Sequence, residues 1–209
     1  MSEYLLSTSG LTKQFGHHKA VNNVDLHVKK GAIYGFIGRN GAGKTTFLKM
    51  ISGLSKPTDG EIQMFGYRNE ELKNVRSRIS CLIEAPGIYG NMSAYHNLAI
   101  KCRLFGINDS KYIENILKIV GLSEVGKKKT KHFSLGMKQR LGIGLALVGE
   151  PDLLVLDEPI NGLDPQGLAE IRDMPLRPKE EQNMTIIISS HILEDLSMIA
   201  THSGIITKG

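Results

Sequence analysis

Cysteine, tryptophan and long apolar runs are scarce or missing in this sequence. Tryptophan is absent, and the only two cysteines, Cys81 and Cys102, do not form a Cys-x-x-Cys pair. A disulfide framework is therefore excluded, and a reducing compartment is indicated. No stretch approaches the roughly 18 apolar residues that a membrane-spanning helix needs, and the N-terminus lacks the basic and apolar regions of a signal peptide. We therefore expect a cytoplasmic chain whose contact with a membrane is made through a partner.

Charge of either sign is also modest. The chain has 209 residues, and 26 Lys and Arg against 21 Asp and Glu leave a net charge of +5, which permits an anionic partner without requiring one. This length predicts one large domain with a substantial core. Glycine is in excess, at 23 of the 209 residues, against a background of about 7%. Such an excess directs attention to places where the backbone turns sharply or approaches a ligand closely.

Periodicity predicts an α/β fold. Residues 24–29 alternate between apolar and polar side chains, as in a half-buried strand, and residues 32–37 form an apolar run typical of a strand buried on both faces. Residues 93–121 instead follow a helical period, with a break near Gly106. Strands that alternate with helices imply a mainly parallel sheet. The expected strands lie at 24–29, 32–37, 61–65, 79–84, 153–156, 185–189 and 204–206.

The segment after the second of these strands has the pattern of a phosphate-binding loop. Residues 38–45 read Gly-Arg-Asn-Gly-Ala-Gly-Lys-Thr and match G-x-x-x-x-G-K-[ST], with an apolar strand before them and a helix-compatible segment after them. Glycines let consecutive N–H groups face phosphate oxygens, and the helix N-terminus adds its dipole. We expect Lys44 to bridge the β- and γ-phosphates, the Thr45 hydroxyl to bind Mg²⁺, and Thr46 to reach the α-phosphate. The residues expected to hold the nucleotide here are Gly38, Asn40, Gly41, Ala42, Gly43, Lys44, Thr45 and Thr46.

Two carboxylates at the end of another apolar strand predict the second half of a hydrolytic site. Residues 153–156 are Leu-Leu-Val-Leu and are followed by Asp157 and Glu158. Hydrolysis of a phosphoanhydride needs a metal to neutralise charge and a group to orient the attacking water. We expect Asp157 to hold Mg²⁺ and Glu158 to polarise the water.

Four further motifs resemble those of the ATP-binding cassette (ABC) ATPases. Residues 133–141, Phe-Ser-Leu-Gly-Met-Lys-Gln-Arg-Leu, resemble the signature motif of that family, and residues 162–165, Gly-Leu-Asp-Pro, resemble its D-loop. His191, just after a predicted strand, resembles the switch histidine, and Phe15 matches the aromatic residue that stacks on adenine. The motifs occur in the order of the family and cover nearly the whole chain.

This resemblance implies the fold and the division of the chain. The expected fold is a P-loop NTPase α/β core with a mainly parallel sheet, an N-terminal antiparallel β lobe and an inserted helical lobe. The chain would form a single nucleotide-binding domain over residues 1–209, with the core at about 1–84 and 134–209 and the helical lobe at about 85–133. Its C-terminus is expected to be shorter than that of many relatives.

The resemblance also implies an ATP site shared by two subunits. In this family two cassettes pair head to tail with two ATP molecules between them. Ser134 and Gly136 would then bind the γ-phosphate of the ATP held by the partner, Asp164 would couple the two sites, and His191 would contact the γ-phosphate. The catalytic set implied is Glu158, His191, Lys44 and Glu84, with ATP and Mg²⁺ as cofactors.

Three positions depart from the usual pattern of the family. Glu84 stands where the family has a glutamine, and we expect its carboxylate to remain a Mg²⁺ ligand. Leu135 replaces the first glycine of the signature, and Arg39 replaces a common proline. Glu84 and Leu135, together with Pro-Gly-Ile-Tyr at residues 86–89, resemble the branch of ABC ATPases associated with bacitracin resistance and lantibiotic self-protection; Arg39 is assigned no function.

The function implied is that of the ATP-hydrolysing subunit of a membrane transporter, an exporter of a peptide antibiotic or a similar compound. The chain would bind membrane-spanning subunits from the cytoplasmic face and pair with itself or a second ABC subunit. The alternative is a soluble ABC ATPase that acts on DNA or ribosomes. Lys44 and Ser134 are only 90 positions apart, too close for the long coiled coil of DNA-repair members, so no nucleic acid is expected. A P-loop kinase is disfavoured by Glu158 and the signature.

The surface for the membrane subunits is expected within residues 84–97. This segment contains the apolar and aromatic residues Ile88, Tyr89, Met92 and Tyr95, which suit a short helix of a partner unless they pack internally. The nature of the cargo cannot be read from this chain, because cargo contacts belong to the membrane subunits.

Two segments fit the function less directly. The basic run at residues 127–131, Lys-Lys-Lys-Thr-Lys, is interpreted as a solvated loop in preference to a site for nucleic acid or anionic lipid. Pro175 and Pro178 fall inside a helix expected over residues 166–182, and each proline removes a backbone donor. We therefore predict an irregular break in that helix.

Overall fold

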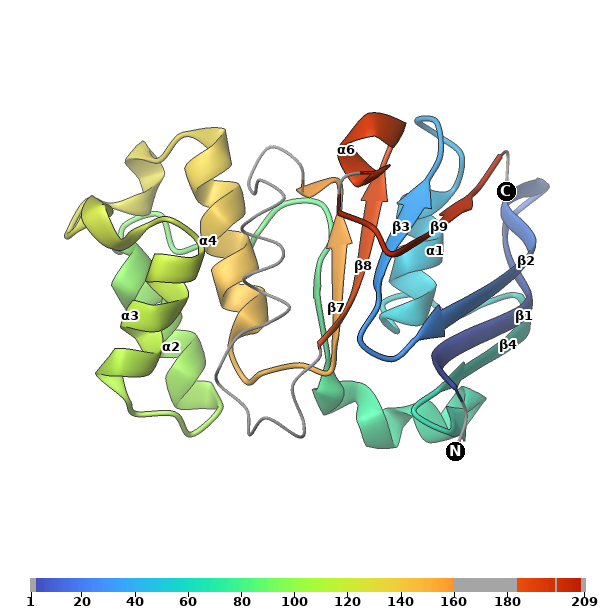
Figure 1. Cartoon of the computed structure of the whole chain (residues 1–209), viewed down its shortest axis with the longest axis horizontal. Helices are drawn as coiled ribbons and strands as arrows, with labels where there is room; N and C mark the ends of the chain where they lie inside the picture. The colour runs from blue at the N-terminus through green and yellow to red at the C-terminus, as the bar shows by residue number, and fades with distance from the viewer. Residues whose placement is uncertain (1–2, 160–183, 198, 208–209) are drawn as a thin grey trace.

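The computed structural model describes residues 3–159, 184–197 and 199–207 (Figure 1). Asp164 with its D-loop, and the helix break expected around Pro175 and Pro178, lie outside the described residues.

The N-terminal part of the chain forms an antiparallel sheet in the order β2-β1-β4-β5. Its strands are β1 (Tyr4–Phe15), β2 (His18–Lys29), β4 (Asp59–Met64) and β5 (Tyr67–Arg68). The strand expected at residues 24–29 thus begins earlier, at His18, because it forms a hairpin with β1. The predicted N-terminal antiparallel lobe is confirmed.

The second sheet is parallel and has the order β6-β7-β8-β3-β9 in the described part of the chain. Its strands are β3 (Ile33–Ile37), β6 (Ile79–Leu82), β7 (Leu153–Asp157), β8 (Thr185–Ser190) and β9 (His202–Ile205). Every residue of β3, β7 and β8 is buried, because helices or the other sheet cover both faces. The predicted parallel sheet is confirmed, and β6 ends two residues before Glu84, whose φ of 65° turns the chain out of the sheet.

The helical segments gather mainly on one side of the parallel sheet. The α-helices are α1 (Lys44–Ile51), α2 (Ala94–Leu104), α3 (Ser110–Ile119), α4 (Leu135–Leu147) and α6 (Leu193–Ser197), and the 3-10 helices are η1 (Asn69–Arg78), η2 (Ser123–Val125) and η3 (Thr130–His132). Helices α2 and α3 are the two helices expected within residues 93–121, and the expected break near Gly106 falls between them. Within the described ranges, no helix combines the length and hydropathy required to cross a membrane.

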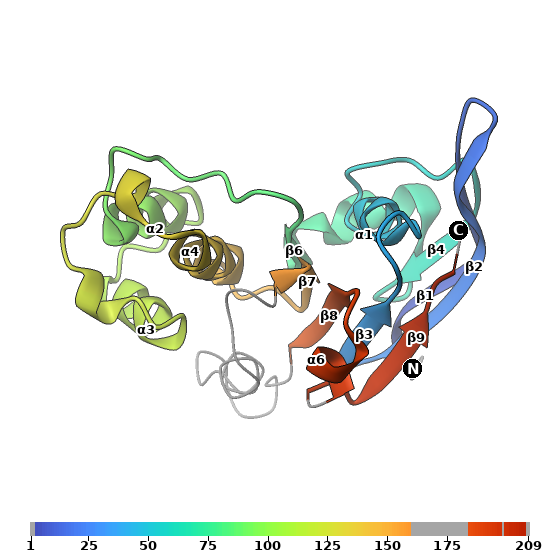
Figure 2. The same ribbon diagram turned by 90° about the horizontal axis from the view of Figure 1, so that it is seen from above.

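Two hydrophobic cores lie on opposite faces of the parallel sheet. One joins the sheet to α2, α3 and α4, and the other joins it to α1 and the antiparallel sheet. Figure 2 shows α2, α3 and α4 on one side of this sheet and α1 with the antiparallel sheet on the other. Helix α4 contacts both α2 and α3 on one side and both β6 and β7 on the other. The boundary expected between residues 133 and 134 therefore lies just before a helix that packs on both parts, and the exact division of the domain stays a prediction.

Candidate functional site

The phosphate loop connects the carboxyl end of β3 to the N-terminus of α1. Its first residue, Gly38, donates its backbone N–H to the Ser190 carbonyl (3.1 Å), and the turn closes through Ala42 N–H to the Arg39 carbonyl (3.1 Å). Gly41 has a φ of 80°, a left-handed conformation that glycine adopts without the steric cost of a Cβ. The loop is therefore folded into the turn that its sequence predicts.

At Gly43 the loop requires glycine for two reasons, the backbone conformation and the lack of space for a side chain. Its φ is 99°, and a Cβ at this position would lie 2.2 Å from the carbonyl oxygen of Ala20. The backbone of β2 therefore packs directly on the loop, which places the hairpin that carries Phe15 beside the start of α1. Phe15 is 56% exposed at the end of β1, so its ring is accessible for stacking on a ligand.

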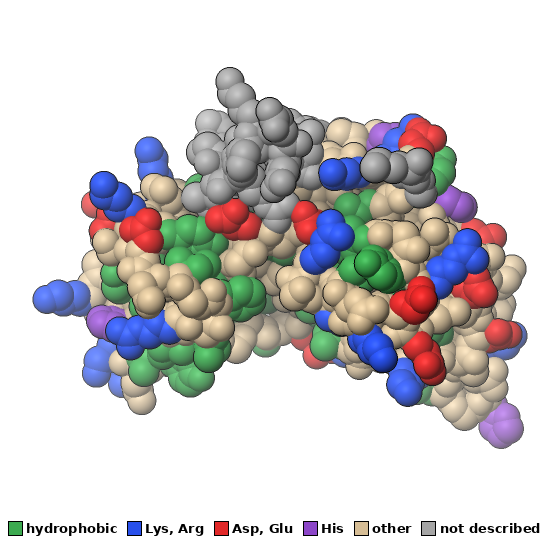
Figure 3. Space-filling view, turned by 90° about the horizontal axis from the view of Figure 1, so that it is seen from below, with side chains coloured by type: hydrophobic (Ala, Val, Ile, Leu, Met, Phe, Trp, Pro, Cys, Tyr) green, Lys and Arg blue, Asp and Glu red, His purple; other side chains and the backbone are tan. Residues whose placement is uncertain are grey.

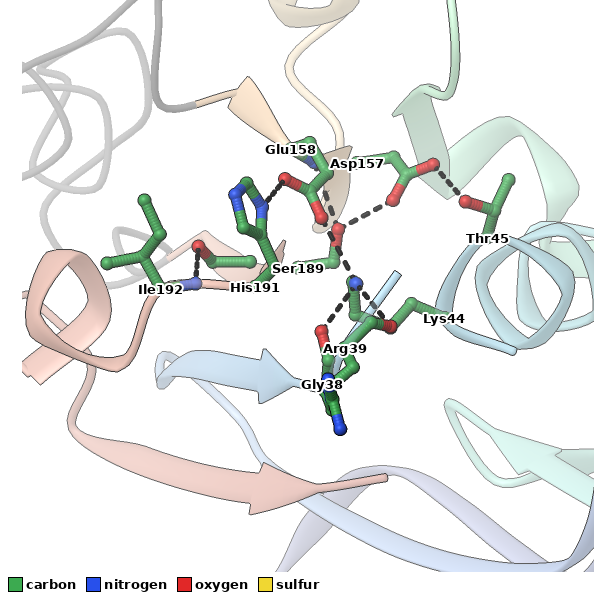
Figure 4. Close-up of polar contacts among 10 residues, drawn as sticks. Gly38, Arg39, Lys44, Thr45, Asp157, Glu158, Ser189, His191 and Ile192 are labelled. Carbon is green, nitrogen blue, oxygen red and sulfur yellow. Dashed lines mark hydrogen bonds and ion pairs between the residues drawn. The ribbon is translucent and has the colours of Figure 1, made fainter. Parts of the chain in front are cut away.

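Lys44 lies at the centre of the loop and is almost fully buried (Figure 4). Its ammonium group donates to the carbonyl oxygens of Gly38 (2.7 Å) and Arg39 (3.3 Å) and lies 3.1 Å from Glu158 Oε1. The hydrocarbon part of the side chain is thus enclosed while the charge is fully paired. The loop therefore encloses a buried cation between two of its own carbonyl oxygens and the Glu158 carboxylate.

Asp157 and Glu158 extend from the end of β7 toward this cation. Asp157 Oδ2 accepts a hydrogen bond from the Thr45 hydroxyl (2.7 Å), and Asp157 Oδ1 accepts one from the Ser189 hydroxyl (2.6 Å). Ser189 in turn accepts the backbone N–H of Glu158 (2.9 Å). The two carboxylates and the first turn of α1 therefore meet at one edge of the sheet, as expected for the carboxyl ends of neighbouring parallel strands.

Glu158 and His191 form a pair beside Lys44. Glu158 Oε2 lies 2.6 Å from His191 Nδ1, and because an ionised carboxylate only accepts hydrogen bonds, the ring nitrogen is the donor. Glu158 has a φ of 51°, a conformation that costs roughly 1 kcal/mol or more for a residue with a Cβ. Because of this conformation the two side chains point in different directions. The Asp157 carboxylate faces Thr45, and the Glu158 carboxylate faces Lys44 and His191 (Figure 4).

Ser189 is the residue of this site that sequence analysis missed. Its hydroxyl organises both carboxylates and is completely buried. Ser189 stands opposite Asp157 in the pairing of β7 with β8. A buried polar residue at the carboxyl end of an otherwise apolar strand was the available signal, but the strand neighbours had to be known before it could be used.

Asn40 and Thr46, the remaining polar loop residues, form no side-chain hydrogen bond within the described part of the chain. Asn40 is exposed at the tip of the loop, and Thr46 is half-buried in the first turn of α1. Their predicted contacts with phosphate stay predictions.

The signature residues lie in the other lobe of the molecule. Ser134 caps α4, since its side-chain oxygen accepts the N–H of Met137 (3.2 Å), and it is exposed together with Leu135, which is 72% exposed. Gly136 follows in the first turn. Figure 1 shows α4 among the lobe helices, apart from β3 and α1. Among the described residues, the structure therefore does not bring Ser134 and Gly136 together with Lys44.

Glu84, predicted to bind Mg²⁺, forms an ion pair with a lysine of α1. Its carboxylate lies 2.6 Å from the ammonium group of Lys49, one helical turn beyond Thr45 on α1, and both side chains are substantially exposed. The predicted role of Glu84 in metal binding is not tested by this contact, but the carboxylate has a cationic partner of its own.

These groups can bind a polyphosphate and promote attack on it. The loop offers N–H groups and a buried cation, Thr45 and Asp157 offer hard oxygen ligands of the kind that Mg²⁺ takes together with phosphate and water, and Glu158 offers a base. The described residues contain no cluster of three or more histidine, cysteine or carboxylate side chains that could hold a metal by itself. A metal held by Thr45 and Asp157 would therefore need further ligands from a bound substrate.

Comparisons with known proteins agree with this geometry. A family model described as ABC transporter matches residues 21–161. The bacitracin transport ATP-binding protein BcrA of Bacillus licheniformis is 48% identical over 208 residues, which cover 98% of this chain and 67% of the relative. The lantibiotic transport ATP-binding protein SrtF of Streptococcus pyogenes is 42% identical over 205 residues, or 98% of this chain and 88% of the relative. The structure of cbiO1 from Clostridium perfringens, part of the ABC transporter complex cbiONQ, matches with a TM-score of 0.79 at 27% identity and covers 100% of this chain and 86% of that one.

Proposed function

The chain belongs to the ABC transporter family of ATP-binding proteins and is an ATPase, and we propose that it drives a membrane transporter that exports a peptide antibiotic or a similar compound. The observation that carries this proposal is the convergence of Lys44, Asp157, Glu158 and His191 at one edge of the parallel sheet. The class of cargo is inferred from the similarity to proteins named for bacitracin and lantibiotic transport. The alternative, an ATPase acting on DNA or ribosomes, gains no support from these relatives.

The contacts among these residues indicate how each of them would act on ATP. When ATP binds, the ammonium group of Lys44 leaves Glu158 and contacts the β- and γ-phosphates. The glycine N–H groups of the loop donate to the other phosphate oxygens. Thr45 and Asp157 would hold Mg²⁺, which when bound neutralises charge that develops on the phosphates. Glu158, once released by Lys44, accepts a hydrogen bond from the attacking water, while His191 holds its other oxygen and the γ-phosphate.

The separation of the two motifs supports a site completed by a second subunit. Ser134 and Gly136 open α4 at an exposed N-terminus, where unpaired backbone N–H groups and the helix dipole favour an anion. The phosphate loop of the same chain, between β3 and α1, lies in the other lobe (Figure 1). Head-to-tail pairing of two chains, or of this chain with a second ABC subunit, would set this N-terminus against the ATP of the partner.

An apolar hollow beside the predicted surface supports docking of a membrane subunit. A cavity of about 300 Å³ lies between β6, the linker that follows it, α2 and α4. Tyr89, Leu104 and Phe105 line it and are 59%, 81% and 50% exposed. Figure 3 shows hydrophobic side chains gathered on the helical half of the face viewed from below. A short amphipathic helix of a membrane-spanning subunit fits such a cavity, and docking there would place the chain on the cytoplasmic face of the membrane.

The predicted surface residues divide into two groups. Tyr89 and Met92 are exposed, whereas Ile88 and Tyr95 pack against the core of the helical lobe. The first pair is available to a partner, and the second pair supports the surface from beneath.

Glu158→Gln in the presence of ATP is the decisive experiment for this function. The amide keeps the shape of the side chain but loses the acceptor strength needed to polarise water, so hydrolysis is expected to fall at least a hundredfold. ATP should then trap a dimer that size-exclusion chromatography with light scattering detects. Glu114→Gln, on the exposed side of α3, is the matched control and should hydrolyse ATP and remain monomeric after turnover. A Glu158→Gln chain that stays monomeric with saturating ATP would contradict the shared site.

A further inference from the structure

Two segments far apart in the sequence are joined beside the docking surface. The backbone N–H of Thr130 donates to the Met92 carbonyl (2.8 Å), and that of Lys131 donates to the Gly90 carbonyl (2.9 Å). The Thr130 hydroxyl donates to the Tyr89 carbonyl (2.9 Å). The linker that carries the exposed Tyr89 and Met92 is therefore bonded to η3 by three hydrogen bonds.

A buried amide fixes the same linker from the other side. Asn97 Oδ1 accepts the N–H of Tyr89 (2.8 Å), and Asn97 Nδ2 donates to the carbonyls of Tyr89 (3.2 Å) and Ser93 (2.9 Å). Asn97 is 2% exposed and Thr130 is 0% exposed. Buried polar side chains that satisfy backbone groups in this way specify a single local arrangement.

Beyond Thr130 the chain leads directly to the signature helix. The N–H of Phe133 donates to the Thr130 carbonyl (3.1 Å), the Phe133 ring is buried, and Ser134 then caps α4. The linker also touches this helix further along, since a Cβ on Gly142 would lie 2.6 Å from Pro86. Tyr89, Thr130 and the first turn of α4 are thus joined by a continuous chain of hydrogen bonds.

We propose that Thr130 is a positioning residue that couples a membrane subunit docked at Tyr89 and Met92 to the signature residues Ser134 and Gly136. The inference rests on the proposed function, because it needs both the docked subunit and the shared ATP site. Thr130 contacts neither nucleotide nor partner. Its hydroxyl acts by holding the Tyr89 carbonyl. The linker at residues 83–93, which carries Tyr89 and Met92, and the start of α4 therefore move as one body.

Thr130→Val and Thr130→Ser separate this role from a purely structural one. Valine keeps the volume and both backbone hydrogen bonds but removes the hydroxyl donor, and the Tyr89 carbonyl retains its bond from Asn97, so the fold should survive. Serine keeps the donor. The test measures ATP hydrolysis by the chain alone and after assembly with its membrane-spanning subunit in liposomes, together with ATP affinity and thermal unfolding.

Thr130→Val should bind ATP within twofold of the native chain and keep its basal hydrolysis within twofold. Its stimulation by the membrane subunit should fall at least fivefold, in kcat and not in KM, and Thr130→Ser should restore it. Full stimulation of Thr130→Val would overturn the inference alone. Loss of stimulation in both variants, in proportion to a lower Tm, would assign Thr130 a structural role and overturn it as well. A native chain that hydrolyses ATP without any stimulation would instead contradict the proposed function.

Discussion

The ammonium group of Lys44 lies 3.1 Å from a carboxylate oxygen of Glu158. The cation expected to meet the phosphates of ATP is thus held by the carboxylate expected to polarise the attacking water. Binding of ATP must separate the two groups, and the loss of their contact opposes binding.

Glu158→Gln should therefore bind ATP more tightly than the native chain. Removing the charge weakens the contact that ATP has to displace, and a charge-assisted hydrogen bond contributes about 1.5–3 kcal/mol, part of which a neutral amide retains. We expect affinity to rise about threefold to tenfold in a titration with a non-hydrolysable fluorescent ATP analogue, at concentrations where the chain is monomeric. Glu114→Gln should leave the affinity unchanged. Weaker binding by Glu158→Gln would show that the contact does not oppose ATP.

Ser189→Ala should reduce hydrolysis far more than ATP binding. The change leaves the Glu158 N–H and one Asp157 oxygen without the hydroxyl that holds them. Unsatisfied buried groups cost about 1–3 kcal/mol each, and both carboxylates lose their orientation. We expect kcat to fall tenfold to a hundredfold, with ATP affinity within threefold.

Thr185→Ala is the matched control for Ser189. Thr185 is buried at the opposite end of β8, where its hydroxyl accepts the N–H of Gly31 (2.9 Å). Its loss should lower the Tm by a similar amount without reducing kcat more than twofold. Equal losses of kcat in both variants would indicate that general destabilisation of β8, and not the carboxylates, limits hydrolysis.

Glu84→Gln should retain ATP hydrolysis within about tenfold. The amide oxygen is still a possible metal ligand, and the ion pair with Lys49 that it removes is exposed, so its contribution to stability is at most about 1 kcal/mol. Lys49→Met breaks the same pair while leaving the carboxylate in place. A complete loss of hydrolysis in Glu84→Gln, with normal activity in Lys49→Met, would assign the carboxylate a specific chemical role.

Lys101→Met should stabilise the chain at neutral pH. Lys101 is half-buried in the wall of the docking cavity, and burial holds its pKa below the ordinary value of 10.5. A lowered pKa means that the unfolded chain binds the proton more tightly, so the charge disfavours folding below that pKa. We expect Lys101→Met to raise the Tm by about 2 °C at pH 7. The exposed Lys118→Met on α3 should not.

The effect of Lys101 should depend on pH in a defined direction. Between the folded pKa and 10.5 the unfolded chain binds more protons, so the stability of the native chain rises with pH in this window. The difference in Tm between the native chain and Lys101→Met should therefore narrow as the pH approaches 10. A difference that widens with pH would show that the ammonium group stabilises the fold.

The site was predictable where its chemistry is local in the sequence. The loop from Gly38 to Thr45 carries its own turn, cation and helix start, and Asp157 and Glu158 follow an apolar strand directly. Ser189 was not predictable in this way, because its place opposite Asp157 depends on which strands become neighbours. The same limit applies to Thr130, whose partner Tyr89 lies 41 positions earlier in the chain.

The ends of strands were predictable only where a residue type such as glycine indicates the backbone conformation of a turn. The strand expected to reach Glu84 ends at Leu82, and the strand expected to reach Phe65 ends at Met64, because Glu84 and Phe65 adopt positive φ angles of 65° and 54°. Neither residue is a glycine, so the residue type did not indicate a turn at either position. The long strand β1 has several register shifts against β2, which disturb the alternation that sequence analysis relies on.

Strand β7 connects the two hydrophobic cores residue by residue. Leu154 and Leu156 belong to the core beneath the lobe helices, and Leu153 and Val155 belong to the core beneath the antiparallel sheet. If β7 leaves the sheet, both cores lose side chains at the same time. The lobe proposed to meet the membrane subunit and the lobe that carries the phosphate loop should thus melt in a single cooperative transition, and ATP bound to one should protect the other against heat.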